Sequence, residues 1–245
     1  METRTALVTG AAQGLGQEFA VALAGRGYRV AGLDLVPQPR TAAKILDYVE
    51  LVGDVTDEEA IEAQLERLID RFGTLHVVVN NAGVRPSKPF EETTAEDWRR
   101  VMRVNLEGPF LVTQAALPYL KAAGWGRIVN IASAAVFTAP PTMVPYVASK
   151  MGLIGFTRAL AAALAPYGIT ANAIAPTMLR TAVATATAEH TAGADGGFES
   201  VRAGQAVART QEPADLVSTL LYVVDEGSGF LTGQTLNVSG GSAYL

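Results

Sequence analysis

Short apolar runs alternate with helix-like segments along almost the whole of the 245-residue chain. Runs with the length and boundaries of buried strands cover residues 5–9, 29–33, 48–52, 75–79, 127–131, 169–173 and 235–238. Helical patterns cover residues 15–25, 57–72, 95–122 and 146–165. The apolar runs are continuous, which is typical of strands covered on both faces of a parallel sheet. The sequence therefore predicts an α/β fold, a doubly wound and mostly parallel sheet with helices on both faces.

The same pattern continues without a linker-like segment or an internal repeat, and 245 residues suffice for one large core. We therefore expect a single domain over residues 1–245. The stretch from about 182 to 212 is rich in small residues and contains the glycine-broken run 193–197. It is either a lid over a substrate site or a pair of frayed helices.

Composition excludes several classes of function. The chain has no cysteine, which excludes disulfides, a thiolate nucleophile and cysteine metal ligands, and its two histidines, His76 and His190, are far apart. We therefore expect no metal site. A net charge of −5 argues against nucleic-acid binding. No apolar run approaches the ~18 residues that span a membrane, so we expect a soluble, cytoplasmic protein without a membrane partner.

Glycines between the first predicted strand and helix indicate a dinucleotide site. Gly10, Gly14 and Gly16 would let the backbone approach a pyrophosphate at the helix N-terminus, although three glycines alone also suit a plain turn. Asp34 ends the second strand, where a carboxylate can bind ribose hydroxyls and repel a 2′-phosphate. Gln13 brings no compensating positive charge. These residues predict NAD rather than NADP as the cofactor.

A tyrosine and a lysine are candidates for proton transfer. Tyr146 and Lys150 are four residues apart, which places both on one face of a predicted helix. A nearby ammonium is expected to lower the pKa of the phenol, which could then exchange a proton with an alcohol oxygen. Ser133 follows the fifth strand, where a hydroxyl can reach the ligand crevice, although a turn serine is the ordinary interpretation.

The chain, with these residues in this order, resembles the short-chain dehydrogenase/reductase family, in its single-domain branch of ~250 residues. The resemblance runs nearly end to end and rests on 9–16 (TGAAQGLG), Asp54-Val55, 80–83 (NNAG), Asn105, Ser133, 146–150 (YVASK), 172–176 (NAIAP), Thr181 and 232–238 (TGQTLNV). It implies a seven-stranded Rossmann fold.

The resemblance also implies roles for individual residues. Tyr146 would be the acid/base, Lys150 would bind the nicotinamide ribose, Ser133 would hold the carbonyl, and Asn105 would anchor a water in a proton relay. Residues expected at the cofactor are Gly10, Gln13, Gly14, Leu15, Gly16, Asp34, Leu35, Asp54, Val55, Asn81, Ala82, Gly83, Tyr146, Lys150, Pro176, Thr177, Met178 and Thr181. Thr177 stands where the family usually has glycine, so its side chain faces a region near the nicotinamide that is normally open.

Apolar residues near the predicted catalytic group favour a hydrophobic or aromatic substrate. Those expected at the substrate, with Ser133 and Tyr146, are Ala135, Val136, Phe137, Met143, Val144 and Met178, and several could instead pack the core. Arg85 could pair with a substrate carboxylate, or remain solvated, or lie at a subunit contact.

We therefore expect an NAD(H)-dependent oxidoreductase that interconverts a small secondary alcohol and a ketone. The segments 34–37 and 172–181 are similar to the branch that oxidises aryl alcohols such as phenylethanol. A 3-oxoacyl (carrier-protein or CoA) reductase and a non-catalytic dinucleotide-binding sensor are the alternatives. The resemblance further implies a homotetramer.

Overall fold

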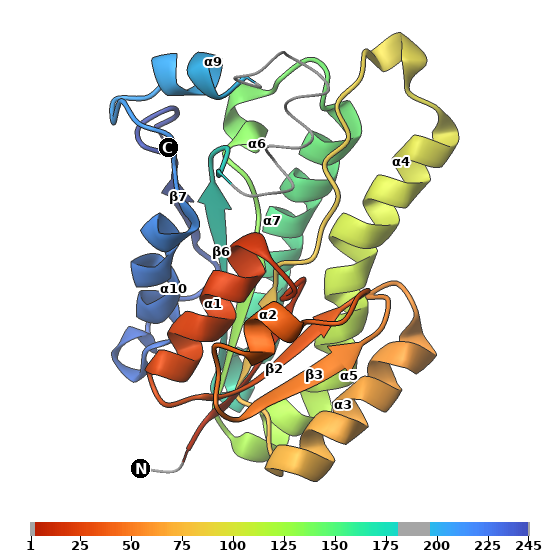
Figure 1. Ribbon diagram of the computed structural model, residues 1–245, viewed down its shortest axis with the longest axis vertical. Helices are drawn as coiled ribbons and strands as arrows, with labels where there is room; N and C mark the ends of the chain where they lie inside the picture. The colour runs from red at the N-terminus through yellow and green to blue at the C-terminus, as the bar shows by residue number, and fades with distance from the viewer. Residues whose placement is uncertain (1–2, 181–196, 245) are drawn as a thin grey trace.

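A single parallel sheet forms the centre of the molecule (Figure 1). The structure is a computed structural model that describes residues 3–180 and 197–244. All six strand pairings are parallel, and the seven strands lie in the order β3-β2-β1-β4-β5-β6-β7. The strands are β1 (Thr5–Thr9), β2 (Arg29–Asp34), β3 (Tyr48–Val52), β4 (Val77–Asn80), β5 (Gly126–Ile131), β6 (Ile169–Pro176) and β7 (Thr235–Val238). This arrangement confirms the predicted doubly wound Rossmann fold.

Helices cover both faces of the sheet (Figure 1). The described helices are α1 (Gly14–Gly25), α2 (Pro39–Ala42), α3 (Glu58–Phe72), α4 (Ala95–Met102), α5 (Gly108–Ala123), α6 (Ala135–Thr138), α7 (Val144–Leu164), α9 (Phe198–Ala203) and α10 (Val217–Val224). One core cluster packs α3, α5 and α7 on one face, with Leu68 and Leu120 fully buried. A second cluster packs α1 and α10 on the other face, with Phe19 and Leu220 fully buried.

The predicted helix over 95–122 is interrupted. It consists of α4, a π-helical turn at Arg103–Glu107 and α5. Pro109, at the start of α5, has no backbone N–H to donate to the preceding turn, which favours a break there. The interruption has a consequence for the site, because it carries the fully buried Asn105.

Several short helices were not predicted, among them α2, α6 and α10. Helix α2 begins at Pro39, a residue whose fixed φ suits the first turn of a helix. Helix α10 has only eight residues, too short for its apolar pattern to be separated from that of a strand.

Helix α7 and its extension to Tyr167 are also long and apolar enough, by length and composition, to cross a membrane. The sequence was expected to contain no such segment. In this fold α7 packs against β6 and buries Leu153, Ile154 and Ala161. Core helices of water-soluble proteins commonly pass the same test, and Lys150 on this helix lines the cleft described below.

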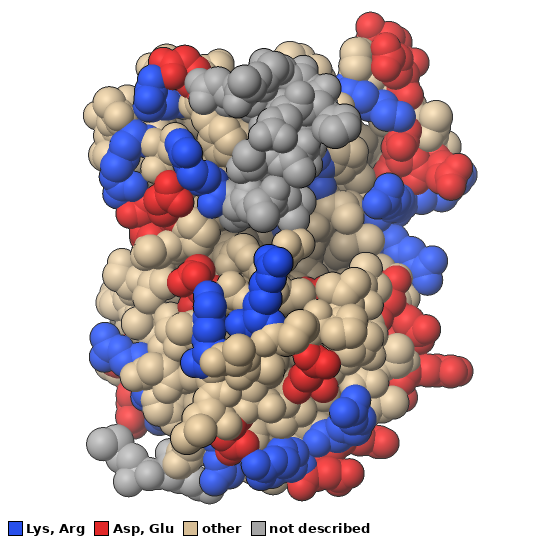
Figure 2. Space-filling view, viewed as in Figure 1, with Lys and Arg blue, Asp and Glu red and all other residues tan. Residues whose placement is uncertain are grey.

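Charged side chains of both signs are interspersed over the face shown in Figure 2. This mixture agrees with the small net charge of −5. The ion pairs on the surface include Arg71–Asp47 at 2.6 Å and Arg209–Asp215 at 2.6 Å. Both are exposed, so each stabilises the fold by no more than about 1 kcal/mol.

Candidate active site

A cleft of about 1400 Å³ lies at the carboxyl ends of the strands. The direction of strand order reverses between β1 and β4, and in open α/β sheets ligands bind in the crevice at such a point. The loops after β1, β2, β4, β5 and β6 all contribute to the lining. Of the residues predicted at the cofactor, those that line the cleft are Gly10, Gln13, Gly14, Leu15, Asp34, Leu35, Asp54, Val55, Asn81, Ala82, Gly83, Tyr146, Lys150, Pro176, Thr177 and Met178.

The loop after β1 is shaped to accept a pyrophosphate. Gly10 and Gly14 have φ angles of +67° and +59°, which side-chain-bearing residues rarely adopt. A Cβ on Gly16 would lie 2.1 Å from the carbonyl oxygen of Gly10, so this glycine permits close packing behind the loop and does not itself line the cleft. Gln13 precedes α1 without a side-chain cap, which leaves N–H groups at the helix N-terminus available to an anion. The loop fits a dinucleotide.

Asp34 is held at the end of β2 by the glycine loop. Its Oδ2 accepts a hydrogen bond from the Ala12 N–H at 2.9 Å, and its Oδ1 accepts from the Val36 N–H at 3.4 Å. Behind it the buried Gln38 donates to the carbonyl oxygens of Gly32 and Leu51. Sequence reasoning missed Gln38, because nothing in a Pro-Gln-Pro segment indicates a buried amide.

Thr9 and Asn81 join the first and fourth strands at the floor of the cleft. The Thr9 hydroxyl accepts hydrogen bonds from the N–H groups of Asn81 and Ala82, both at 3.0 Å. The Asn81 amide donates to the Thr9 carbonyl oxygen at 2.9 Å. These bonds fix the 81–83 loop beside the glycine loop.

Ser133, Tyr146 and Lys150 converge in the cleft from β5 and α7. Lys150 is almost fully buried and donates to the Ile131 carbonyl oxygen at 2.7 Å. Burial lowers the pKa of Lys150 to about 8. Its Nζ lies 6.0 Å from the centroid of the Tyr146 ring.

The electrostatics of Tyr146 correct one expectation. Burial raises the pKa of the phenol above its ordinary value, and this effect is opposed by a hydrogen bond with Ser133 and by the charge of Arg85. Lys150 was expected to lower the pKa, but the groups that do so here are Ser133 and Arg85. Desolvation by the surrounding apolar residues exceeds their combined effect.

Asn105 lies behind the cleft and does not line it. Its amide donates to the Val84 carbonyl oxygen at 2.9 Å and to the Ser149 hydroxyl at 3.1 Å, and its Oδ1 accepts from the Val84 N–H at 2.8 Å. Ser149 in turn donates to the Tyr146 carbonyl oxygen at 2.8 Å. The π-helical turn thus ties the loop after β4 to α7. Ser149 was missed, although a serine beside Lys150 on the inner face of a helix needs a polar partner.

Only some of the residues predicted at the substrate line the cleft. Ala135, Met143 and Met178 line it. Val136 and Phe137 pack instead with a small core cluster around Ile154, and Val144 is an exposed residue at the start of α7. Sequence reasoning missed two groups of lining residues. Val84, Thr142 and Leu179 lie next to predicted residues, whereas Ser200, Gly204 and Ser242 come from segments further along the chain.

Gln211 anchors the loop after β6. Its Oε1 accepts from the Thr177 N–H at 3.0 Å, and its amide donates to the Val238 carbonyl oxygen at 2.7 Å. Among the described non-glycine residues only Ala139 has a positive φ, so Thr177 needs no left-handed backbone. Thr181 and residues 182–196 of the predicted lid lie outside the described residues, whereas α9 follows them and contributes to the cleft.

Comparisons with known proteins identify the family. Residues 4–192 match the model of the short-chain dehydrogenases, and the chain belongs to this family of oxidoreductases. It is 36% identical over 250 residues to the trans-4-hydroxycyclohexanecarboxylate dehydrogenase of Sinomonas cyclohexanicum, covering 97% of this chain and 92% of that one. It is 34% identical over 252 residues to the (2S)-[(R)-hydroxy(phenyl)methyl]succinyl-CoA dehydrogenase subunit BbsD of Thauera aromatica, covering 100% and 98%.

A solved structure agrees with the fold over nearly the whole chain. An actinorhodin polyketide ketoreductase with NADPH superposes with a TM-score of 0.92 at 32% identity, covering 99% of this chain and 98% of that one. The family binds a nicotinamide dinucleotide, and the glycine loop described above fits that ligand.

Proposed function

We propose that the chain is an NAD(H)-dependent oxidoreductase that interconverts a secondary alcohol and a ketone on a hydrophobic ring-bearing substrate. The proposal depends on one observation. Ser133, Tyr146 and Lys150 line the same cleft as the glycine loop after β1, which fits a dinucleotide, and Asp34 is hydrogen-bonded to that loop. Relatives named for a hydroxycyclohexanecarboxylate and for a hydroxy(phenyl)methylsuccinyl-CoA support a ring-bearing alcohol.

Each residue has a defined part in this reaction. The glycine loop would hold the pyrophosphate, Asp34 the adenosine ribose, and Lys150 the nicotinamide ribose. The bound nicotinamide supplies or accepts the hydride at the carbinol carbon. In ketone reduction the carbonyl oxygen takes the phenol proton of Tyr146, while the Ser133 hydroxyl stabilises the charge that develops on that oxygen. Asn105 is a positioning residue, because it acts through Val84 and Ser149.

The test is a panel of secondary alcohols and ketones, assayed with NAD(H) and NADP(H) at 340 nm. We expect turnover with NADH and aryl or cyclic ketones, and much lower efficiency with NADPH. Dinucleotide binding without turnover of any substrate would favour the sensor instead.

A 3-oxoacyl reductase is the second candidate, favoured by the likeness to a polyketide ketoreductase that carries NADPH. It predicts that NADPH and acyl thioesters outperform NADH and simple ketones. The carboxylate of Asp34 opposes it, since a 2′-phosphate would be repelled at this position.

We further propose a homotetramer. Helices α5 and α7 and the 3-10 turn after α7 expose Phe110, Met151 and Tyr167, each more than two fifths accessible, which supplies apolar surface for contact between copies. Sedimentation velocity at micromolar concentration tests this, and a monomer would contradict it.

A further inference from the structure

A half-buried guanidinium borders the part of the cleft where the substrate would lie. Arg85 follows the 81–83 loop and lines the cleft with Val84 and Met143. In the ranges 3–180 and 197–244, no hydrogen bond or ion pair engages its side chain. A cation beside apolar groups is stabilised when an anion pairs with it.

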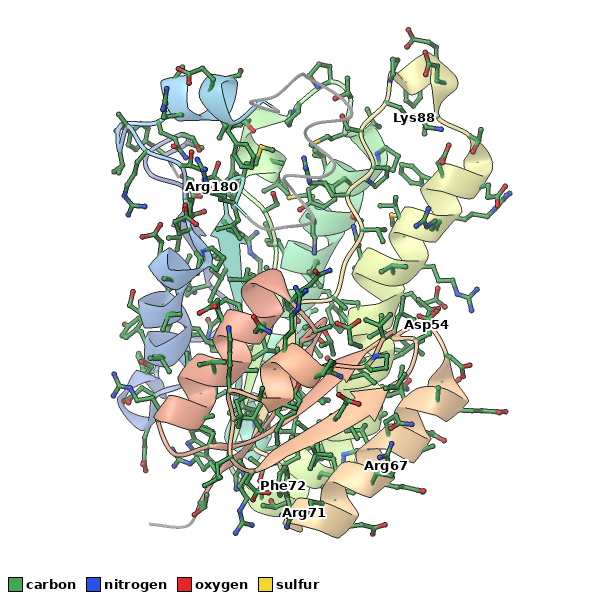
Figure 3. All side chains as sticks on the ribbon, in the orientation of Figure 1. Asp54, Arg67, Arg71, Phe72, Lys88 and Arg180 are labelled. Atoms are coloured by element: carbon green, nitrogen blue, oxygen red, sulfur yellow. The ribbon has the colours of Figure 1, made fainter. Side chains whose placement is uncertain are left out.

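Two other cations that line the cleft, Lys150 and Arg103, are engaged. Lys150 donates to a main-chain carbonyl oxygen at 2.7 Å, and Arg103 donates to another at 3.2 Å. Lys88, three residues after Arg85, is paired with Asp97 at 2.6 Å and lowers the pKa of that carboxyl (Figure 3). The sequence thus provides a carboxylate for Lys88, while Arg85 meets none in the described part of the chain.

Arg85 lines the same cleft as the Tyr146 phenol. Its charge is felt at the phenol of Tyr146, whose pKa it lowers, yet no hydrogen bond joins the two side chains. A substrate whose reacting oxygen contacts the phenol could therefore extend toward Arg85. Arg99 and Arg100 border the same cleft from α4, but both are exposed to solvent, which weakens any selection they exert.

We propose that Arg85 binds a carboxylate of the substrate, and that the enzyme acts on hydroxy acids and oxo acids whose carboxylate is separate from the reacting carbon. A guanidinium presents two parallel N–H groups that match the two oxygens of a carboxylate. The apolar residues around it would hold the carbon skeleton between the two polar ends. The proposal rests on the proposed function, because it assigns the substrate class of that same site.

The experiment compares two ketones of similar shape, 4-acetylbenzoate and 4-methylacetophenone. Their kcat/KM values with NADH are measured for the wild type and for Arg85→Gln, Arg85→Lys and Arg67→Gln. Arg67 is an exposed arginine on α3, away from the cleft (Figure 3), so its variant removes the same charge without touching the site. We expect the wild type to favour the acid by about 10–100-fold, as for a hydrogen-bonded charged group.

Arg85→Gln should remove this preference, mainly through KM, whereas Arg85→Lys should keep part of it and Arg67→Gln all of it. The readout is the ratio of the two kcat/KM values, one for each ketone. Loss of Arg85 also changes the pKa of Tyr146, but this change affects both ketones equally and cancels in the ratio. An unchanged ratio in Arg85→Gln would overturn the proposal.

A binding measurement separates this proposal from the proposed function. Calorimetric titration of 4-methylbenzoate into each variant, in the presence of NADH, requires no turnover. Weaker binding to Arg85→Gln than to wild type and Arg67→Gln supports the carboxylate site, and equal binding overturns it. Failure of both ketones to react would count against the proposed function while leaving this comparison interpretable. Matching melting temperatures establish that the variants are folded.

Discussion

The two sides of the cleft are built by different means. The cofactor side comprises residues 9–16, 34–35 and 81–83. The residues with left-handed backbone conformation on this side are glycines, and hydrogen bonds join Asp34 and Asn81 to the neighbouring main chain. The substrate side comprises residues 135–143, 178–179, 197–204 and 242. Its lining is mostly apolar or small, and Ala139 in this region has a φ of 46°.

This difference indicates how the enzyme divides its work. A preorganised cofactor side binds one ligand common to the family, because its donors and acceptors are fixed before the ligand arrives. The substrate side provides shape, and few of its groups can orient a substrate by hydrogen bonds. Selectivity should therefore depend on single residues such as Arg85, and catalysis on Tyr146.

The largest expected effect separates catalysis from cofactor binding. Tyr146→Phe removes the hydroxyl that exchanges the proton and leaves the cofactor side intact. We expect kcat to fall by about 10²–10⁴-fold, with NADH affinity within a few-fold of wild type by fluorescence titration. Turnover within tenfold of the wild type would exclude Tyr146 as the acid/base.

The second prediction changes only the cofactor side. NADP would place a phosphate beside Asp34, and like charges a few ångströms apart cost about 1–4 kcal/mol, or roughly tenfold to a thousandfold in affinity. In the double variant Asp34→Ser/Gln13→Arg, the kcat/KM for NADPH divided by that for NADH should rise by roughly tenfold to a thousandfold. Asp34→Ser alone is the control, since it removes the repulsion without adding a phosphate partner. Equal efficiency of both cofactors in the wild type would contradict the role of Asp34.

A third effect appears in the pH profile. Alcohol oxidation needs the Tyr146 phenolate, and burial raises the pKa of this phenol, so kcat/KM for oxidation should rise about tenfold per pH unit through the neutral range. Ketone reduction needs the protonated phenol and should stay level over the same range. Because Arg85 lowers the pKa of Tyr146, Arg85→Gln should move the alkaline limb of oxidation to higher pH. An unmoved limb would show that the two charges are not coupled.

The two sides also differ in how far sequence predicts them. The glycine loop, Asp34 and the Tyr146–Lys150 pair each need a residue type at a fixed spacing on one strand or helix, so they can be recognised locally. The lining of the cleft includes both Met143 and Ser242, residues about a hundred positions apart, and no sequence spacing predicts that two such residues line one cleft. Val136 and Phe137 show the same limit, since an apolar residue beside a catalytic serine suits a core as well as a pocket.

The smallest expected effect concerns the backbone of the substrate side. Ala139 ends α6 in the left-handed region, with φ 46° and ψ 60°, which costs an L-residue about 1–2 kcal/mol. Ala139→Gly removes this strain but gives the unfolded chain more freedom, at about 0.4–1 kcal/mol. The free energy of unfolding should therefore rise by about 0.5–1 kcal/mol in urea titrations. Ala122→Gly, at an exposed helical position of α5, should instead lower it by about the same amount. A loss of stability in Ala139→Gly equal to that in Ala122→Gly would mean that residue 139 carries no strain, and that the substrate side is as relaxed as the cofactor side.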